Sequence, residues 1–251
     1  MNVGLSSSIL SWFPRDEGGA FLDLSMRQRS YEHLQRAEYF LTYNSNPSDH
    51  DRADCISNLR KCLSHRQKHF EEVYNLRSAL QTPKKRHYLE ILADLGVIRP
   101  SLIQGLLQIR NDIEYNDSAP PDISKCRDFS DIVWYFLRST DPLLYTERTD
   151  IILTPPEADT FNSVYWCSLD IQYVPTFEVK LSGWFPPHLV TESPSSADLA
   201  IVADKFVTKT DDPVIELAHS SRNADDFWVI GKLVAKAEEC RALIRLALTA
   251  I

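Results

Sequence analysis

The sequence has 251 residues, of which 43% are hydrophobic and 25% charged, and a formal net charge of −8 at pH 7. This composition is typical of a globular protein with one large or two small domains, and the lack of GxxxxGK[ST] and GxGxxG patterns argues against a glycine-rich phosphate loop. No apolar stretch reaches the roughly 18 residues of a membrane span and the N-terminus lacks a secretory signal, so we expect a cytoplasmic protein without membrane association.

The charge is distributed unevenly along the chain. Residues 1–145 contain 18 Lys and Arg against 19 Asp and Glu, whereas residues 146–251 contain 9 against 16. An acidic surface is poorly suited to bind the backbone of a nucleic acid, because both carry negative charge. Any phosphate-binding role therefore belongs to the first part of the chain.

The cysteines and histidines give no sign of a metal centre or a disulfide framework. The five cysteines are an odd number without a CxxC pair, which indicates reduced thiols. His65 and His69 have the i,i+4 spacing of metal ligands on a helix, but no HExxH carboxylate and no third ligand accompany them. We therefore expect no metal and no cofactor.

Helical periodicity dominates the first part of the chain after an irregular start. Residues 1–25 show no clear period and are predicted to form an N-terminal arm. Apolar residues then recur at helical spacing, and Asp49 is a candidate N-cap of the longest of the expected helices. Five helices are expected, over 26–43, 49–77, 82–97, 99–115 and 120–140. Together they would form a helical bundle over residues 26–145.

The pattern changes after Pro142. Residues 169–173 and 177–181 alternate between apolar and polar side chains, which predicts a small antiparallel sheet. Residues 225–248 have the apolar period of a long amphipathic helix. The expected fold is therefore mainly α, with the N-terminal helical bundle followed by a smaller α+β unit over residues 146–251 that ends in a long C-terminal helix.

One arginine of the second helix occupies an unusual position. Arg66 falls within the apolar stripe that includes Leu63 and Phe70, so its side chain would project towards the core. Because a buried guanidinium needs a partner, we predict a hydrogen bond from Arg66 to an acceptor on the helix over 99–115 or on the one over 120–140. Asp112 and Glu114 are the candidates on the former, and Arg66 would brace that helix from behind.

The fourth helix ends in the sequence IRNDIEY. Arg110 and Glu114 are spaced i,i+4 and can form a surface ion pair worth a few tenths of a kcal/mol, which is the purely structural interpretation. Arg110 and Tyr115 would point about 140° apart on a regular helix. They can meet at one ligand only if the helix breaks between them or if two chains combine their copies.

This segment resembles a motif of the HEPN superfamily, the higher eukaryotes and prokaryotes nucleotide-binding domains, and the resemblance covers roughly residues 26–140. Arg110 and Asn111 match the start of the family's Arg-polar-spacer-His motif, and Tyr115 stands at the position of the histidine. Many members are metal-independent ribonucleases of toxin–antitoxin and abortive-infection systems. The resemblance therefore implies a ribonuclease or nucleotide-directed toxin that acts on RNA or a nucleotide phosphate as a homodimer. Its catalytic residues would be Arg110, Asn111 and Tyr115.

Tyr115 leaves a second interpretation open. An unperturbed tyrosine has a pKa of about 10 and is a poor general base at pH 7, unlike the histidine that it would replace. The alternative is a non-catalytic HEPN-like module that binds a nucleotide, RNA or a protein partner. The C-terminal unit would then serve as a sensor or a scaffold for that partner.

Overall fold

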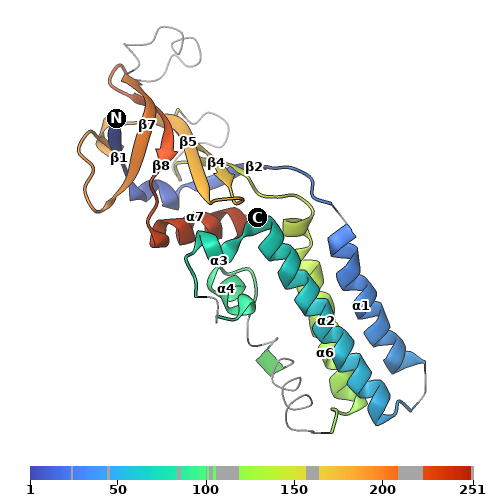
Figure 1. The fold of residues 1–251 in the computed structure, drawn as a ribbon. Helices are drawn as coiled ribbons and strands as arrows, with labels where there is room; N and C mark the ends of the chain where they lie inside the picture. Colours follow the sequence, from blue (N-terminus) through green and yellow to red (C-terminus); the bar gives the residue numbers. More distant parts are fainter. Residues whose placement is uncertain are drawn as a thin grey trace. The chain divides into compact units, whose positions relative to one another are not determined.

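The computed structural model describes residues 1–23, 25–43, 46–83, 86–99, 101, 104–105, 119–156, 164–208 and 223–249. The chain divides into two compact units (Figure 1). The sheet unit comprises Met1–Ala20, Ser78–Thr82 and Arg148–Ile251, and the helical unit comprises Phe21–Arg77 and Pro83–Glu147. Every helix within the described ranges is too short or too polar to cross a membrane.

The helical unit is built on three long helices with well-defined ends. They are α1 (Ser25–Thr42), α2 (Asp49–Tyr74) and α6 (Ile123–Thr140). Ser48, and not the predicted Asp49, is the N-cap of α2, because its side chain accepts from the backbone N–H of Asp51 while the Asp51 carboxylate accepts from the Ser48 N–H. The helix ends at Asn75, whose φ of 42° is left-handed.

Shorter elements complete the helical unit. The helix expected over 82–97 is confined to α4 (Tyr88–Asp94), because the ring Nδ1 of His87 accepts from the Leu89 N–H and caps the helix there. The 3-10 turn η2 (Pro142–Leu144) follows α6, and the chain passes from the helical unit to the sheet unit within α3 (Leu76–Ala79), after Arg77. The helix expected over 99–115 falls largely outside the described residues.

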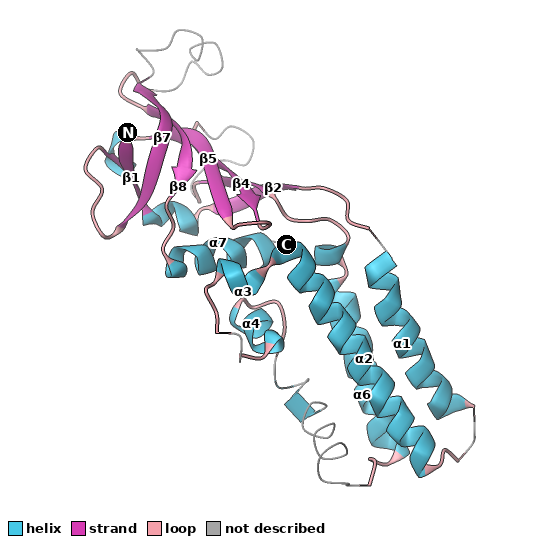
Figure 2. Cartoon of the chain, viewed as in Figure 1, coloured by secondary structure: helices cyan, strands magenta, loops and turns pink. Residues whose placement is uncertain are grey.

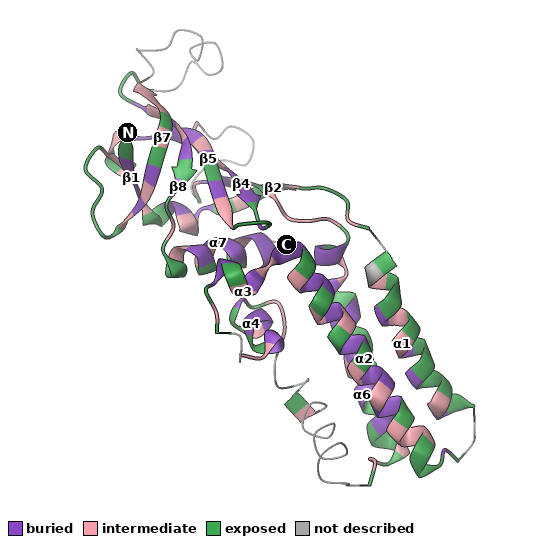
Figure 3. Cartoon of the chain, viewed as in Figure 1, coloured by how far each residue is buried: buried purple, intermediate pink, exposed green. Residues whose placement is uncertain are grey.

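The core of the helical unit forms where α1, α2 and α6 pack against one another. The predicted stripe of α2 is confirmed, since its large apolar side chains are at most 8% exposed. Most of α1 is exposed, and its buried residues recur at helical intervals (Figure 3). The buried apolar side chains include Leu34, Ala37 and Leu41 of α1, Leu59, Leu63, Phe70 and Val73 of α2, and Phe129, Val133 and Leu137 of α6.

The sheet unit contains an antiparallel sheet of eight strands in the order β2-β3-β4-β5-β8-β7-β1-β6 (Figure 2). Short turns separate several of the strands along the chain, among them the 3-10 turns η1 (Ser7–Ser11) and η3 (Pro187–Leu189). The strands are β1 (Asn2–Ser6), β2 (Phe13–Gly18), β3 (Asp150–Thr154), β4 (Trp166–Gln172), β5 (Glu178–Phe185), β6 (Val190–Thr191), β7 (Asp198–Thr208) and β8 (Phe227–Leu233).

The prediction of a mainly α fold with a small sheet is therefore wrong. The sheet is large, and residues 1–25, which we predicted to form an arm, supply two of its strands. Val3 and Leu5 of β1 are fully buried, and their strand pairs with β7 almost two hundred residues further along the chain. A five-residue strand with so distant a partner leaves little periodic signal in the sequence, and that is why we missed it.

The long C-terminal helix expected over 225–248 is also wrong in its first part. Phe227–Leu233 forms the strand β8, which lies between β5 and β7, and only Ala237–Thr249 forms a helix, α7. Gly231 suits the central strand because a Cβ there would lie 2.5 Å from the carbonyl oxygen of Val202 on β7. α7 buries one face, formed by Cys240, Leu243, Ile244, Ala247 and Leu248.

A basic strip on the helical unit as candidate functional site

The predicted catalytic residues lie outside the part of the chain that the structure describes. These are Arg110, Asn111 and Tyr115, and the same holds for the predicted partners Asp112 and Glu114. Their roles therefore stay predictions. Described residues of α1, α2 and α6 form a second candidate site.

Arg66 is fully buried, as predicted, and its partner is Asp141. Its Nη2 lies 2.9 Å from Oδ1 of Asp141, the residue that follows the last turn of α6. The hydroxyl of Tyr31 on α1 donates to the other carboxylate oxygen of Asp141 over 2.7 Å. Burial first, and then this hydrogen bond, raise the pKa of Tyr31 to about 12. One carboxylate thus links all three long helices.

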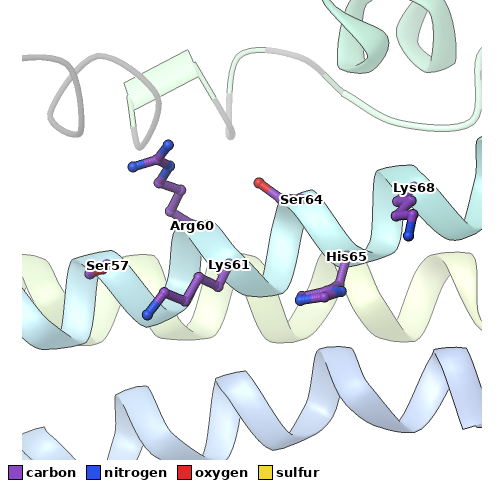
Figure 4. Close-up of a pocket in the computed structure, with 6 residues that line it drawn as sticks. All are labelled: Ser57, Arg60, Lys61, Ser64, His65 and Lys68. Atoms are coloured by element: carbon purple, nitrogen blue, oxygen red, sulfur yellow. The ribbon is translucent and has the colours of Figure 1, made fainter.

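Two sets of basic side chains with the same spacing lie on α1 and α2. Arg29, His33 and Arg36 follow one another at i, i+4 and i+7 on α1, and Lys61, His65 and Lys68 do so on α2. This spacing places each set on one face of its helix. We call these six residues the basic strip. In Figure 4, Lys61 and His65 extend from the side of α2 that is nearest to α1, whereas Arg60 extends from the other side.

The two sets face each other at the centre of the strip. The rings of His33 and His65 stack with centroids 5.0 Å apart and planes 14° apart. Because α1 and α2 form an antiparallel hairpin (Figure 1), Arg29 and Lys68 lie on one side of the stacked histidines along the helices, and Arg36 and Lys61 lie on the other side. We call each of these three pairs of basic residues, one from each helix, a rung of the strip.

The sequence around the strip contains few acids to offset these charges. Residues 57–69 include four Lys and Arg and no Asp or Glu, and residues 27–36 include three arginines and one acid, Glu32. Burial, followed by the charges of His33, Arg29 and Lys68, lowers the pKa of His65. The ring of His65 is therefore close to basic groups of both helices.

The strip borders two open hollows of the surface. One has about 330 Å³ and is lined by Ser57, Arg60, Lys61, Ser64, His65 and Lys68 of α2 (Figure 4). The other has about 550 Å³ and is lined by Arg29, Glu32, His33, Gln35, Arg36 and Tyr39 of α1. Serine hydroxyls, imidazoles and cations together are suited to hold oxyanions without a metal.

An exposed aromatic pair follows the strip along α1. Tyr39 is 53% exposed and Tyr43, immediately after the end of α1, is 75% exposed. Their ring centroids are 5.0 Å apart. Large exposed aromatic side chains beside a cationic surface provide faces on which the bases of a nucleic acid can stack.

The sequence drew attention to His65 and His69 through their i,i+4 spacing, which we did not take as a metal site. In the structure His69 is only 4% exposed, whereas His65 stacks on His33 of the other helix. Among the described residues no group of three His, Cys, Asp or Glu side chains could hold a metal ion. The repeated i, i+4, i+7 spacing of basic residues was the signal in the sequence that could have identified the strip.

Comparison of the chain with protein families, curated proteins and solved structures gives no match. The HEPN resemblance therefore stays a prediction that rests on the sequence motif. The assignment of a function depends on the geometry of the described residues.

Proposed function

We propose that the helical unit binds the phosphate backbone of a single RNA strand along the basic strip. The three basic rungs of the strip carry this proposal. Opposed like charges lower the stability of the folded chain and are offset when an anion binds between them. Arg29 and Arg36 lie seven residues apart, which is about 10 Å along the helix. A stacked strand presents about three phosphates over that length, at a rise of ~3.4 Å per nucleotide.

Two features favour a nucleic acid over an acidic peptide as the ligand. Tyr39 and Tyr43 offer exposed rings at the end of the strip, and bases stack on such rings whereas carboxylate side chains do not. The strip is also narrow, since the two helices that carry it are in direct contact. It therefore suits a single strand better than a duplex, in which the two backbones are more widely spaced.

The proposal is tested by fluorescence anisotropy with an oligouridylate of about ten nucleotides, a length within the usual footprint of single-strand sites. We expect binding at low salt, with log K falling against log salt by about 0.7 for each phosphate contact. Arg36→Ala and Lys61→Glu, which change the two members of one rung, should each weaken binding and reduce that slope. Arg127→Glu, at an exposed position of α6, is the matched control.

Two outcomes with the oligouridylate alone would contradict the proposal, and two further outcomes with a competitor or a duplex would do so as well. One is a lack of oligouridylate binding at low salt, and the other is equal loss of affinity in Lys61→Glu and in Arg127→Glu. A polyglutamate competitor that displaces the oligonucleotide at equal charge concentration would instead indicate an acidic peptide as the ligand. A duplex of the same length that binds more tightly would exclude the single strand.

Cleavage of RNA stays a separate prediction, and it rests on Arg110, Asn111 and Tyr115. Incubation of the protein with total RNA in the presence of a metal chelator tests it directly. If the three residues are catalytic, Arg110→Ala abolishes cleavage while the basic strip still binds RNA. Tyr115→His should preserve or raise the cleavage rate, because an imidazole titrates near neutral pH. Cross-linking of the same samples tests the predicted homodimer.

A further inference from the structure

The middle rung of the basic strip differs from the other two in its chemistry. His33 and His65 are half-buried, and their parallel rings lie 5.0 Å apart between an Arg–Lys rung on either side. The Nδ1 atom of His33 is buried and has no hydrogen-bond partner among the described residues. An imidazole is the one side chain of the strip that gains or loses a proton near neutral pH.

The charged groups around the pair are mostly positive. On α1 they are Arg29, Arg36 and the single acid Glu32, which lines the same hollow as His33. On α2 they are Lys61 and Lys68, with Glu72 3.5 Å from the ammonium of Lys68. Both acids are exposed, so solvent screens their effect on the pair.

The negative charge among the neighbouring interior groups is already engaged by other side chains. Arg66 and His69 lie on the buried side of α2, and the charge of Arg66 lowers the pKa of His69, second only to burial. On α6 the nearby charged groups are Arg138, which stacks over the ring of Tyr31, and Asp141, which is bound by Arg66 and Tyr31. In the free protein, burial and then the nearby positive charges lower the pKa of His65 below its usual value.

We infer that the His33–His65 pair is a phosphodiester-binding centre that takes up a proton from solvent together with its ligand. A phosphodiester between the rungs brings the negative charge that the site lacks, and a protonated imidazole can donate N–H to its oxygen. The ligand and the proton therefore stabilise each other's binding, and this coupling is reciprocal. The inference rests on the proposed function and adds to it the role of the histidines.

The coupling has a sign and a magnitude that can be measured. If the ligand raises the pKa of one histidine, affinity increases as the pH falls between the pKa of the bound state and that of the free state. For one proton the increase reaches about tenfold per pH unit within that window. The Arg and Lys rungs keep their charge over the whole range, so they contribute salt dependence without pH dependence.

The test is the affinity for a 5′-hydroxyl oligouridylate at constant ionic strength between about pH 5.5 and pH 7.5, a range that brackets the usual histidine pKa. Neither the phosphodiesters nor the uracils of this probe titrate there, so any dependence belongs to the protein. We expect the dependence to be lost in His65→Gln and in His33→Gln. His50→Gln is the matched control, because His50 is exposed on the first turn of α2, about 22 Å along the helix from His65.

A second measurement covers the case in which a substitution impairs folding. In the unsubstituted protein, an NMR titration of the His65 ring should show a higher pKa with oligouridylate than without it. Affinity that is constant over the pH range, or an unchanged His65 titration when the ligand is bound, would overturn the inference. Binding that is pH-independent but sensitive to salt and to Lys61→Glu would overturn it and leave the proposed function intact, whereas absence of binding at every pH would overturn both.

Discussion

The basic strip of the helical unit and the ion pair between Lys232 and Glu178 on the sheet arrange their exposed charges in opposite ways. Lys180 of β5 pairs with Asp170 of β4 and with Lys232 of β8, and the Lys232 ammonium lies 2.7 Å from the Glu178 carboxylate. On the basic strip of the helical unit, every cross-helix rung joins two basic residues. Complementary pairs support the fold that carries them, whereas opposed like charges act against it. The difference indicates that the Lys232–Glu178 pair serves the structure and that the strip is suited to a ligand.

The largest expected effect concerns Arg66 and Asp141, the most deeply buried ion pair among the described residues of the helical unit. Arg66→Met should lower the free energy of unfolding by about 3–5 kcal/mol, because it removes the guanidinium from a carboxylate that is largely enclosed. Denaturant unfolding measures the change. Arg138→Met is the control, since Arg138 is exposed and contacts the ring of Tyr31 without binding Asp141. An equal effect of the two substitutions would show that Arg66 contributes packing alone.

Reversal of one charge in the strip should raise the stability of the protein and weaken its binding of oligouridylate. Lys61→Glu places a carboxylate opposite Arg36, with no acid within one turn on α2 to repel it. We expect it to stabilise the protein by about 0.2–1 kcal/mol and to weaken oligouridylate binding. Thermal unfolding and anisotropy on the same samples measure both. A variant that loses stability and binding together would indicate that the rung is structural.

The lowered pKa of His65 should make the free protein less stable in acid. Burial, and then the neighbouring positive charges, lower the pKa of His65 below its usual value near 6.5, so the unfolded chain binds the proton more readily. The stability that results is present above about pH 6.5 and is lost as the pH falls through the lower folded pKa. His69 has a shift of the same sign, so His65→Gln should reduce this loss without abolishing it. His50→Gln should leave it unchanged.

The features of the fold that could be predicted from the sequence are those that depend on residues close together in the chain. The stripe of α2 repeats over several turns of one helix, so its period revealed both the helix and the burial of Arg66. β1 has five residues and a partner at the other end of the chain, and no local pattern reports such a pairing. Phe227–Leu233 is apolar enough to suit a helix or a strand, and only its two neighbouring strands decide between them.

The same limit applies to the candidate site. Each half of the basic strip is visible as an i, i+4, i+7 series, but the stacking of His33 on His65 depends on how two helices pack. The partner of Arg66 was expected within a helix, and it is Asp141, the first residue after one. Its position follows from the contacts of α6 with α1 and α2, which a single sequence does not display.

The smallest expected effect concerns the ion pair between Glu178 and Lys232 on the sheet. The hydrogen bond from Lys232, and then its charge, lower the pKa of Glu178 below its usual value. The folded chain therefore binds the proton less readily than the unfolded chain, so the pair stabilises the protein above about pH 4.5 and this stability is lost as the pH falls below it. Glu178→Gln should lower the melting temperature slightly at pH 7 and at low salt, with the difference shrinking towards pH 3 and at high salt, because both groups are exposed to screening. Since Glu178 faces a partner of opposite charge, its replacement should leave oligouridylate binding unchanged. A change in binding as large as the change caused by Lys61→Glu would mean that the negative charge of Glu178 affects the ligand. The distinction between structural and ligand-binding charges would then be wrong.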